Sequence, residues 1–383
     1  MAKQGFKVMD SDMHVIEPPD LWQRYMGPAY RDRAPMGSNE GIRNIAIQFA
    51  DGMSGAVPDM QFDVWLKGLD AHMGPQNHHF QFAEERGYDG TSQLEAMDQE
   101  GIDVSVLFPS RGLFVMGLDS SESTDGPSHD PDFAAAIARA YNDWMNDLCS
   151  ADRTRMYGAA MVAPHDVDSA VKETRRCVEE FGFKSIFLLP GMVNKKPWHH
   201  PDYNPLWAEC QDLDIPVVFH GGGPDLLEPD FGQGFRDSLM LWHTFAHSMG
   251  PMTALVSMIG GGVFDRFPTL RTGYLEANCS WAPWLIYRLE DHYEDYIGRH
   301  EIKLARRVSE YFAENCFVSV EADEAPSELY VQHFGDDNVV FSTDYPHPDT
   351  KFPHAVEKFL ELPLSDETKR KFLWDNCARL YRL

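Results

Sequence analysis

The sequence predicts an α/β protein built as a closed (β/α)8 barrel, or TIM barrel, on two observations. Eight short runs are rich in apolar residues and are bounded by Gly, Pro, Asp or Asn, as is typical of parallel strands buried on both faces. Amphipathic helical stretches separate most of these runs. The main alternative is an open doubly wound sheet, but no GxGxxG motif follows the first run.

The expected strands follow one another along the whole chain. They are FKVMDSDMHV near the N-terminus and then residues 103–110, 155–164, 185–191, 216–223, 271–278, 316–323 and 338–346. Helical patterns fill the intervals, such as PDFAAAIARAYNDWMNDLCS before the third strand and VDSAVKETRRCVEEFG before the fourth. This alternation of strand and helix is the pattern of a parallel barrel.

Two segments interrupt the alternation. Residues 17–91 form a long insertion after the first strand. Residues 224–250 form a second one after the fifth strand, which ends in the helical run DSLMLWHTFAHSM. Loops of this length usually have a function or carry structure of their own. The aromatic side chains of the first insertion, such as Trp22 and Trp65, suit a cap over the barrel or a dimer contact. We expect a single domain over residues 1–383 that carries this cap.

Composition restricts the partners. The formal net charge of −27 argues against binding to nucleic acid or to an anionic membrane surface. The chain has no run of eighteen apolar residues and no apolar signal core at its N-terminus. Its six cysteines are scattered without a CxxC pair, which favours reduced thiols. We therefore expect a cytoplasmic protein that acts on a small molecule.

Metal-binding residue types lie at the ends of three expected strands. Asp12 and His14 end the first strand and share one face of it, because alternate strand residues point the same way. His220 ends the fifth strand and Asp344 ends the eighth, which closes the barrel against the first. The C-terminal strand ends of such a barrel carry its chemistry. Two histidines and two carboxylates there suit Zn²⁺, Mn²⁺ or Fe²⁺.

Several longer motifs resemble one family. They are DSDMHVIEPPDLW, VVFHGGG, GGVFDRFPTLRTGYLEANCSWAPWLIYRLED, VVFSTDYPHPD and DNCARLYRL. Together they resemble the amidohydrolase superfamily, in the branch of aminocarboxymuconate-semialdehyde decarboxylase and related aromatic-acid decarboxylases. The resemblance implies one divalent metal ion, Zn or Mn, with Asp12, His14, His220 and Asp344 as its ligands. It also implies a homodimer.

The chain departs from this branch at the end of the sixth strand. Many decarboxylases of the branch have a His followed by Gly there, which serves as acid or base. This chain has YLEANCSW, so Glu276 fills the position. Glu276, His247 and His243, one turn before His247, are the available substitutes. Loss of that His weakens a decarboxylase interpretation and leaves a hydrolase interpretation nearly untouched.

The leading functional hypothesis is therefore a metal-dependent hydrolase. The metal would activate a water molecule, and Asp344 would take its proton. Glu276 or His247 would protonate the leaving group. Arg111 and Arg236 are candidates for pairing with a substrate carboxylate through their planar guanidinium groups, and His243 is a further candidate substrate contact.

Two other hypotheses remain open. A non-oxidative decarboxylase would use the same metal to hold a substrate phenolate or carbonyl together with its carboxylate, while His247 or Asp344 protonates the ring carbon. A metal-free barrel that binds a small molecule is the third hypothesis. For both enzymes the resemblance implies a small carboxylated aromatic or ring-opened aromatic substrate.

Overall fold

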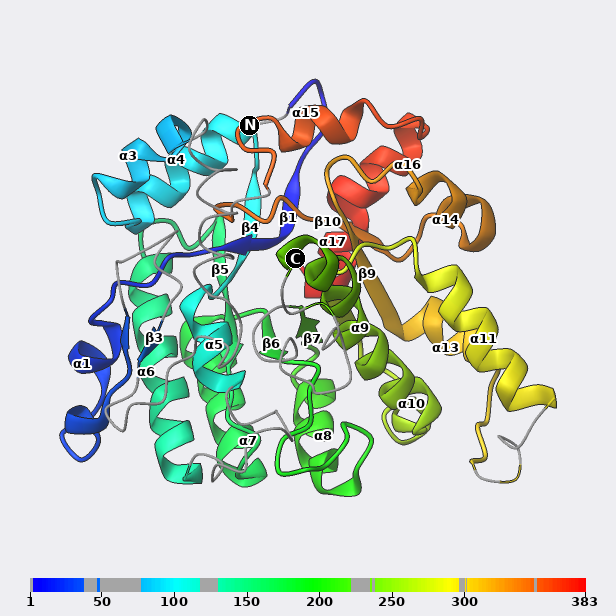
Figure 1. Cartoon of the computed structure of the whole chain (residues 1–383), viewed down its shortest axis with the longest axis horizontal. Helices are drawn as coiled ribbons and strands as arrows, with labels where there is room; N and C mark the ends of the chain where they lie inside the picture. Colours follow the sequence, from blue (N-terminus) through cyan, green and yellow to red (C-terminus); the bar gives the residue numbers. More distant parts are fainter. Residues whose placement is uncertain are drawn as a thin grey trace.

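The computed structural model describes residues 3–37, 47–48, 77–117, 130–221, 235, 238–295, 300, 302–347 and 350–383. Within them, eight parallel strands form one sheet in the order β1-β4-β5-β6-β7-β8-β9-β10 (Figure 1). These are β1 (Met9–His14), β4 (Val104–Phe108), β5 (Met156–Met161), β6 (Ser185–Leu188), β7 (Val217–His220), β8 (Thr272–Leu275), β9 (Cys316–Val320) and β10 (Val339–Phe341). Each strand lies within its predicted run, so the predicted (β/α)8 barrel is confirmed.

The first and last strands of the sheet meet and close the barrel. The backbone N–H of Asp344 donates to the carbonyl of Asp12 over 3.3 Å, and the N–H of His14 donates to the carbonyl of Tyr345 over 2.6 Å. Two of these four residues are predicted metal ligands at the end of β1, and Asp344 is the predicted ligand after β10. The closure of the barrel therefore places both sets of ligands side by side.

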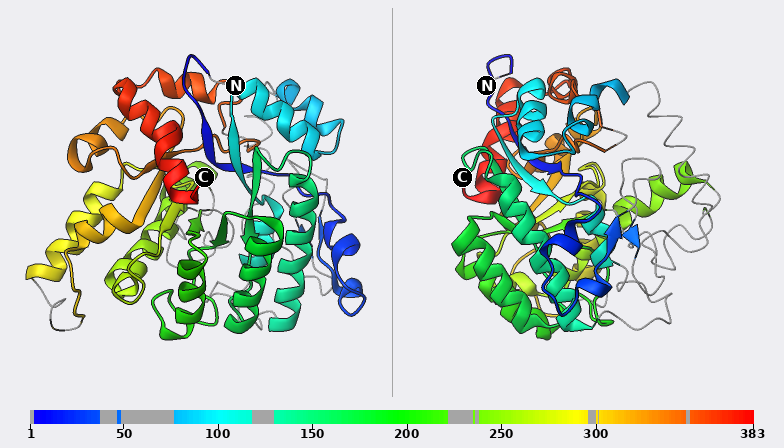
Figure 2. Two further views of the ribbon diagram at one scale, coloured as in Figure 1. Left: turned by 180° about the vertical axis from the view of Figure 1, so that it is seen from behind. Right: turned by 90° about the vertical axis from the view of Figure 1, so that its left-hand side faces the viewer.

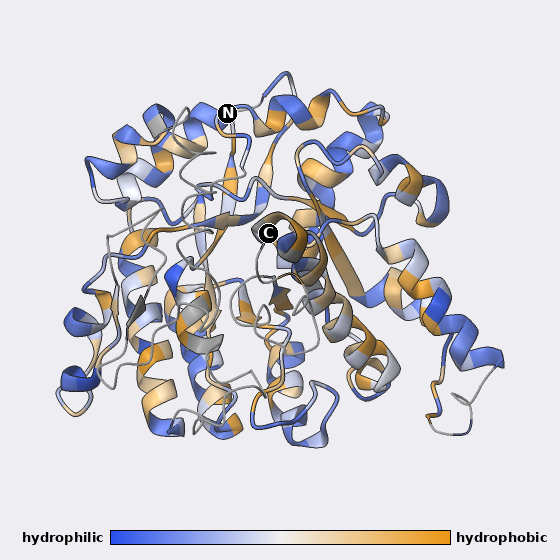
Figure 3. Cartoon of the chain, viewed as in Figure 1, coloured by the Kyte–Doolittle hydropathy of each residue, from blue (hydrophilic) through white to orange (hydrophobic). Residues whose placement is uncertain are grey.

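Helices cover the outside of the barrel, and Figure 2 shows α6, α7 and α8 standing next to one another there. The larger ones are α4 (Gly90–Glu100), α6 (Pro131–Cys149), α7 (Val167–Arg176), α8 (Asn204–Asp212), α9 (Leu239–Gly260), α11 (Ala282–Asp295), α13 (Val308–Asn315) and α14 (Ser327–Phe334). Shorter ones are α1 (Leu21–Tyr25), α3 (Gln81–Glu84), α5 (Arg111–Gly117), α10 (Val263–Arg266), α15 (Ala355–Leu360), α16 (Asp366–Arg370) and α17 (Asn376–Tyr381). Most strands are mainly hydrophobic, β1 being the exception, whereas the helices mix polar and hydrophobic residues (Figure 3).

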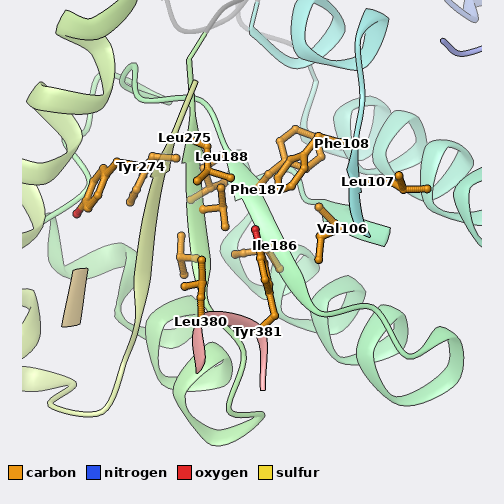
Figure 4. Packing of buried hydrophobic residues seen from close by; sticks show 14 of the residues in the cluster. Val106, Leu107, Phe108, Ile186, Phe187, Leu188, Tyr274, Leu275, Leu380 and Tyr381 are labelled. Atoms are coloured by element: carbon orange, nitrogen blue, oxygen red, sulfur yellow. The ribbon is translucent and has the colours of Figure 1, made fainter. Parts of the chain in front are cut away.

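The C-terminal helix α17 closes the end of the barrel at which the strands begin. Its Leu380 is fully buried, and the Tyr381 hydroxyl donates to the carbonyl of Ser11 in β1 over 2.7 Å. Arg271, directly before β8, donates from Nε to the carbonyl of Leu380 over 3.0 Å. Figure 4 shows Leu380 and Tyr381 below the apolar side chains of the strands. The described part of this end of the barrel is therefore filled by packing.

The described parts of the first insertion pack beside the barrel. Trp22 of α1 is fully buried, and its Nε1 donates to the carbonyl of Ile137 in α6 over 3.3 Å. The Tyr25 hydroxyl donates to Asp147 Oδ2 in the same helix over 2.8 Å. Trp22 is therefore buried between α1 and α6, and a cap formed by the insertion stays a prediction. Trp65 lies outside the described residues, and the dimer contact stays a prediction.

The second predicted insertion, 224–250, overlaps a regular helix. Helix α9 begins at Leu239 and continues to Gly260, with Pro251 inside it. Its start is capped by Ser238, whose hydroxyl accepts from the N–H of Leu241. The helical run predicted at the end of the insertion is therefore confirmed, and it forms the first half of the helix that packs behind β7 and β8.

No helix in the described part of the chain combines the length and the apolar character that crossing a bilayer requires. All six cysteines are free and buried.

Truncation of Leu380 tests the role of α17. Because Leu380 is fully buried, we expect Leu380→Ala to lower the free energy of unfolding by about 2–5 kcal/mol, through lost burial and the cavity left behind. Leu383 is 40% exposed three residues later, and Leu383→Ala should change the same quantity by less than about 0.5 kcal/mol. Urea unfolding monitored by circular dichroism measures both values. Equal effects of the two changes would contradict the packing of α17.

Candidate metal centre

Three side chains of metal-ligand type converge at the C-terminal end of the barrel. Asp12 and His14 come from β1 and His220 from β7, and all three are fully buried. The Nε2 atoms of His14 and His220 are 3.0 Å apart. Asp12 Oδ1 lies 3.2 Å from Nε2 of His220 and 3.5 Å from Nε2 of His14. Ligand atoms that surround one tetrahedral Zn²⁺ are separated by roughly 3.3 Å, so these three atoms are spaced as ligands of a single ion.

Hydrogen bonds to the backbone determine which imidazole nitrogen faces this centre. His14 Nδ1 lies 2.7 Å from the carbonyl oxygen of Pro109, and His220 Nδ1 lies 2.6 Å from that of Gly221. Because a carbonyl oxygen only accepts, both Nδ1 atoms carry the hydrogen and both Nε2 atoms present lone pairs in the neutral rings. Asp12 Oδ2 is buried without a hydrogen-bond partner. The residues therefore form an electron-rich cluster that fits a divalent cation.

The electrostatics of the cluster favour a positive charge at its centre. Burial alone would lower the pKa of His220, but the carboxylates of Asp12 and Glu276 outweigh burial and raise it to about 9. The pKa of His14 is held well below its ordinary value by burial and by the neighbouring His347 and His220. The carboxylates thus favour a positive charge beside His220, whether a proton on its ring or a metal ion in the proton's place, while His14 stays neutral.

Two further carboxylates face the cluster from neighbouring strand ends. Asp344 Oδ1 lies 3.5 Å from His14 Nε2, and Glu276 Oε2 lies 3.3 Å from His220 Nδ1. Both residues have left-handed backbone conformations, with φ of 58° for Asp344 and 52° for Glu276. Non-glycine residues adopt this conformation rarely and often at functional sites, where it directs a side chain into the site. The strand ends of β8 and β10 are therefore shaped to deliver these carboxylates.

Asp10 lies beneath the cluster and connects β1 to the segment after β10. Its carboxylate accepts hydrogen bonds from the N–H of Asp12 over 3.1 Å, from the N–H of Thr343 over 3.2 Å and from the Thr343 hydroxyl. Burial raises its pKa to about 7, against the opposing effect of these hydrogen bonds. Asp10 therefore holds the backbone of the candidate ligand Asp12 and of Thr343, which directly precedes the candidate ligand Asp344.

A cavity of about 310 Å³ opens next to the cluster, between the start of α9 and the ends of β8, β9 and β10. Its polar lining includes two of the predicted histidines, whose rings stack with centroids 4.3 Å apart, His243 and His247. His247 Nε2 lies 3.5 Å from Glu276 Oε1. The other lining residues are Thr244, Ser248, Glu276, Asn278, Glu321, Ala322, Asp323, Ser342, Thr343, Asp344, Thr350 and Lys351.

The two predicted arginines are placed differently. Arg111 is fully buried and donates from Nε to the carbonyl of Glu17 over 2.8 Å, while its guanidinium lies against Gly37. Burial lowers its pKa to about 10, with Glu17 opposing the change. Arg111 is thus anchored to the segment after β1 and is not among the residues that line the 310 Å³ cavity. Its contact with substrate stays a prediction, and Arg236 lies outside the described residues.

His347 is a site residue that the sequence interpretation missed. Its Nδ1 lies 2.7 Å from Asp344 Oδ1 and 3.8 Å from Glu276 Oε1, and its ring lies 3.9 Å from that of His14. These four side chains form a second group whose ligand atoms are close enough to share one ion. The signal was present in STDYPHPD, where His347 follows Asp344 by three residues. A single histidine in a proline-containing turn, however, resembles many surface histidines.

Curated relatives of the chain are decarboxylases by name. The gamma-resorcylate decarboxylase of Polaromonas sp. is 24% identical over 301 residues, which cover 76% of this chain and 86% of the relative. The 2-amino-3-carboxymuconate-6-semialdehyde decarboxylase of Dictyostelium discoideum is 25% identical over 300 residues, which cover 77% of each protein.

Solved structures share the fold. A dihydroxybenzoic acid decarboxylase from Polaromonas sp., solved with bound manganese and the inhibitor 2-nitroresorcinol, superimposes with a TM-score of 0.65. It is 18% identical, and the match covers all of this chain and 98% of that one. The family model described as amidohydrolase (Amidohydro_2) matches residues 59–383, which is most of the chain. The chain therefore belongs to the amidohydrolase family.

Proposed function

We propose that the protein is a metal-dependent, non-oxidative decarboxylase of a small aromatic or related unsaturated carboxylic acid. The sequence alone favoured hydrolysis, but both named relatives above are decarboxylases and they match across three quarters of the chain. The observation that carries metal dependence is the pair of imidazole Nε2 atoms, His14 and His220, 3.0 Å apart beside Asp12. In this proposal Asp12, His14, His220 and Asp344 hold one divalent ion.

The chemistry of the donor atoms suits the metal that a relative contains. Carboxylate oxygen and imidazole nitrogen are ligands of both Mn²⁺ and Zn²⁺, and manganese is bound in the Polaromonas structure. When bound, such an ion supplies Lewis acidity that polarises the oxygen atoms of a substrate. We favour Mn²⁺ for this chain on that basis, with Zn²⁺ as the alternative.

Decarboxylation also requires a proton at the ring carbon that loses its carboxylate. The new C–H bond forms with that proton, and the electron pair of the breaking C–C bond returns to the ring as CO₂ leaves. His247 lines the cavity and points Nε2 toward Glu276, 3.5 Å away. We assign the proton delivery to His247 and its orientation to Glu276. A glutamate–histidine pair would thus replace the single sixth-strand histidine of many decarboxylases in this branch.

Buried aromatic side chains pack against His220 and hold its ring in place. Phe108, at the end of β4, stacks on His220 with ring centroids 5.5 Å apart, and Phe187 of β6 meets Phe108 edge-on at 6.2 Å. Beyond them a small cleft is lined mainly by apolar residues after β5 and β6, including Val162 and Trp198. This cleft holds only about 20 Å³, so we place the substrate in the 310 Å³ cavity beside Glu276 and Asp344.

Metal content tests the proposed ligands. We expect about one equivalent of a divalent metal in the purified protein or after reconstitution with Mn²⁺, and loss of most of it in His220→Ala and in Asp344→Ala, because each change removes a ligand. His354→Ala, which alters an exposed histidine paired with Glu357, should keep the wild-type content. Plasma mass spectrometry measures the content, after circular dichroism has shown that each variant folds. Wild-type protein that takes up no metal would favour the metal-free binding hypothesis.

Product analysis separates decarboxylation from hydrolysis. The manganese-loaded protein is incubated with hydroxybenzoates and unsaturated dicarboxylates, and with aromatic amides and esters in parallel. We expect CO₂ release from at least one carboxylic acid, measured by a coupled carboxylase assay, and no hydrolysis of the amides or esters. Hydrolysis without CO₂ release would return the hydrolase hypothesis to first place.

Substitution of His247 tests the proton donor. His247→Gln keeps a polar side chain of similar size but removes the acid, and should lower kcat by about 10²- to 10⁴-fold with a smaller effect on KM. Thr244→Ala alters another residue of the cavity lining on the same helix and should lower kcat by less than tenfold. Steady-state kinetics on the substrate found above give both values. A kcat close to wild type in His247→Gln would exclude this residue as the donor.

A further inference from the structure

His347 makes contacts with three different strand ends of the candidate metal centre. Its Nδ1 lies 2.7 Å from Asp344 Oδ1, after β10, and 3.8 Å from Glu276 Oε1, after β8. Its ring packs on that of His14, from β1, with centroids 3.9 Å apart and planes tilted by 31°. Of these neighbours, Asp344 is the one in closest contact.

The other side of the His347 ring is anchored. Its Nε2 lies 3.0 Å from the hydroxyl of Ser110, a side chain that is almost completely buried. The backbone of Ser110 is itself held, because its N–H donates to Glu17 Oε2 over 3.2 Å. Glu17 also accepts from the N–H groups of Arg111 and Gly112 at the start of α5. The anchor is therefore part of a buried network and not a mobile surface group.

This arrangement excludes Ser110 as a nucleophile. The order Ser110, His347, Asp344 has the connectivity of a serine hydrolase triad. However, the Ser110 side chain is buried, and the N–H groups beside it that could stabilise an oxyanion are occupied by the Glu17 carboxylate. Ser110 therefore holds the His347 ring in place and does not act as a nucleophile.

We propose that His347 is a positioning residue that orients the carboxylate of Asp344 toward the metal, with Ser110 fixing the imidazole ring. This inference rests on the proposed role of Asp344 as a metal ligand. Asp344 follows a short strand and has a left-handed backbone, so its side chain needs support from a neighbouring element. Groups that hydrogen-bond to metal ligands keep those ligands in the geometry that binds the ion, and their loss typically weakens metal affinity about 10- to 100-fold.

Two substitutions of His347 distinguish the loss of its hydrogen bond to Asp344 from the loss of its ring. His347→Phe keeps a planar ring of similar size and removes both nitrogens. His347→Asn places an amide near the position of Nδ1 and therefore preserves a donor for Asp344. We expect the Kd for Mn²⁺ to rise about 10- to 100-fold in His347→Phe and by much less in His347→Asn. Ser110→Ala should raise the Kd by a smaller factor than His347→Phe, because it loosens the ring without removing it.

The measurement uses Mn²⁺ alone, titrated into metal-free full-length protein and followed by electron paramagnetic resonance. The signal of the free ion gives its concentration and hence the Kd. The zero-field splitting of the bound ion reports the arrangement of its ligands. A changed splitting in His347→Phe that returns toward wild type in His347→Asn would support positioning. If His347→Phe does not fold, as judged by circular dichroism, Ser110→Ala and His347→Asn carry the test.

Two results would overturn the proposal. One is unchanged Mn²⁺ affinity and splitting in His347→Phe. Where His347→Phe does not fold, the corresponding result is unchanged affinity and splitting in both Ser110→Ala and His347→Asn. The other is an equally large loss of affinity in the Phe and Asn variants, which would mark His347 as a direct ligand. Because no substrate is present, the outcome does not depend on which bond the enzyme breaks. Failure of the CO₂ assay would therefore refute the proposed reaction while leaving this inference standing.

Discussion

Two imidazole nitrogens that face one another set the electrostatics of the candidate metal centre. His14 and His220 each commit Nδ1 to a backbone carbonyl, so both Nε2 atoms point at the same space, 3.0 Å apart. Asp12 adds a carboxylate oxygen to that space and leaves its other oxygen without a hydrogen-bond partner. Burying such a group of acceptors without a cation is unfavourable, because nothing compensates their lost hydration. A positive charge at this point relieves the repulsion and satisfies all three side chains.

The closure of the barrel is what assembles this centre. β1 and β10 are far apart in sequence, yet Asp12 and Asp344 are joined by a backbone hydrogen bond across the seam between these strands. Asp10 strengthens the same seam from below through its bonds to Asp12 and Thr343. At the other end of the barrel, Tyr381 of α17 holds β1 by the carbonyl of Ser11. The strand that carries two of the candidate ligands is therefore held by β10, by the segment after it and by α17.

Glu276 occupies the position at which many decarboxylases of the resembled branch have a sixth-strand histidine. Imidazole side chains from other elements nevertheless surround this position. Glu276 lies within 4 Å of three histidines from other elements: His220, His247 and His347. Burial opposes its ionisation, but these histidines hold its pKa well below the ordinary value. A carboxylate that stays ionised suits the orientation of a neighbouring acid better than the donation of a proton. The loss of the sixth-strand histidine favoured hydrolysis in the sequence. With His247 beside an ionised Glu276, that loss is compatible with the proposed decarboxylase.

The sequence by itself determined the eight strands, their order and the residues at their ends. The period of two placed Asp12 and His14 on one face, and the rule that chemistry lies at C-terminal strand ends selected His220, Glu276 and Asp344. Only the tertiary structure decided which side chains touch. Trp22 of the first insertion is bonded to α6, and Arg111 is anchored to Glu17, which neither sequence pattern indicates. His347 reads as a loop residue but contacts Asp344. Local patterns specify strands and faces, whereas these contacts depend on side-chain rotamers and on segments brought together by folding, which no short stretch of sequence encodes.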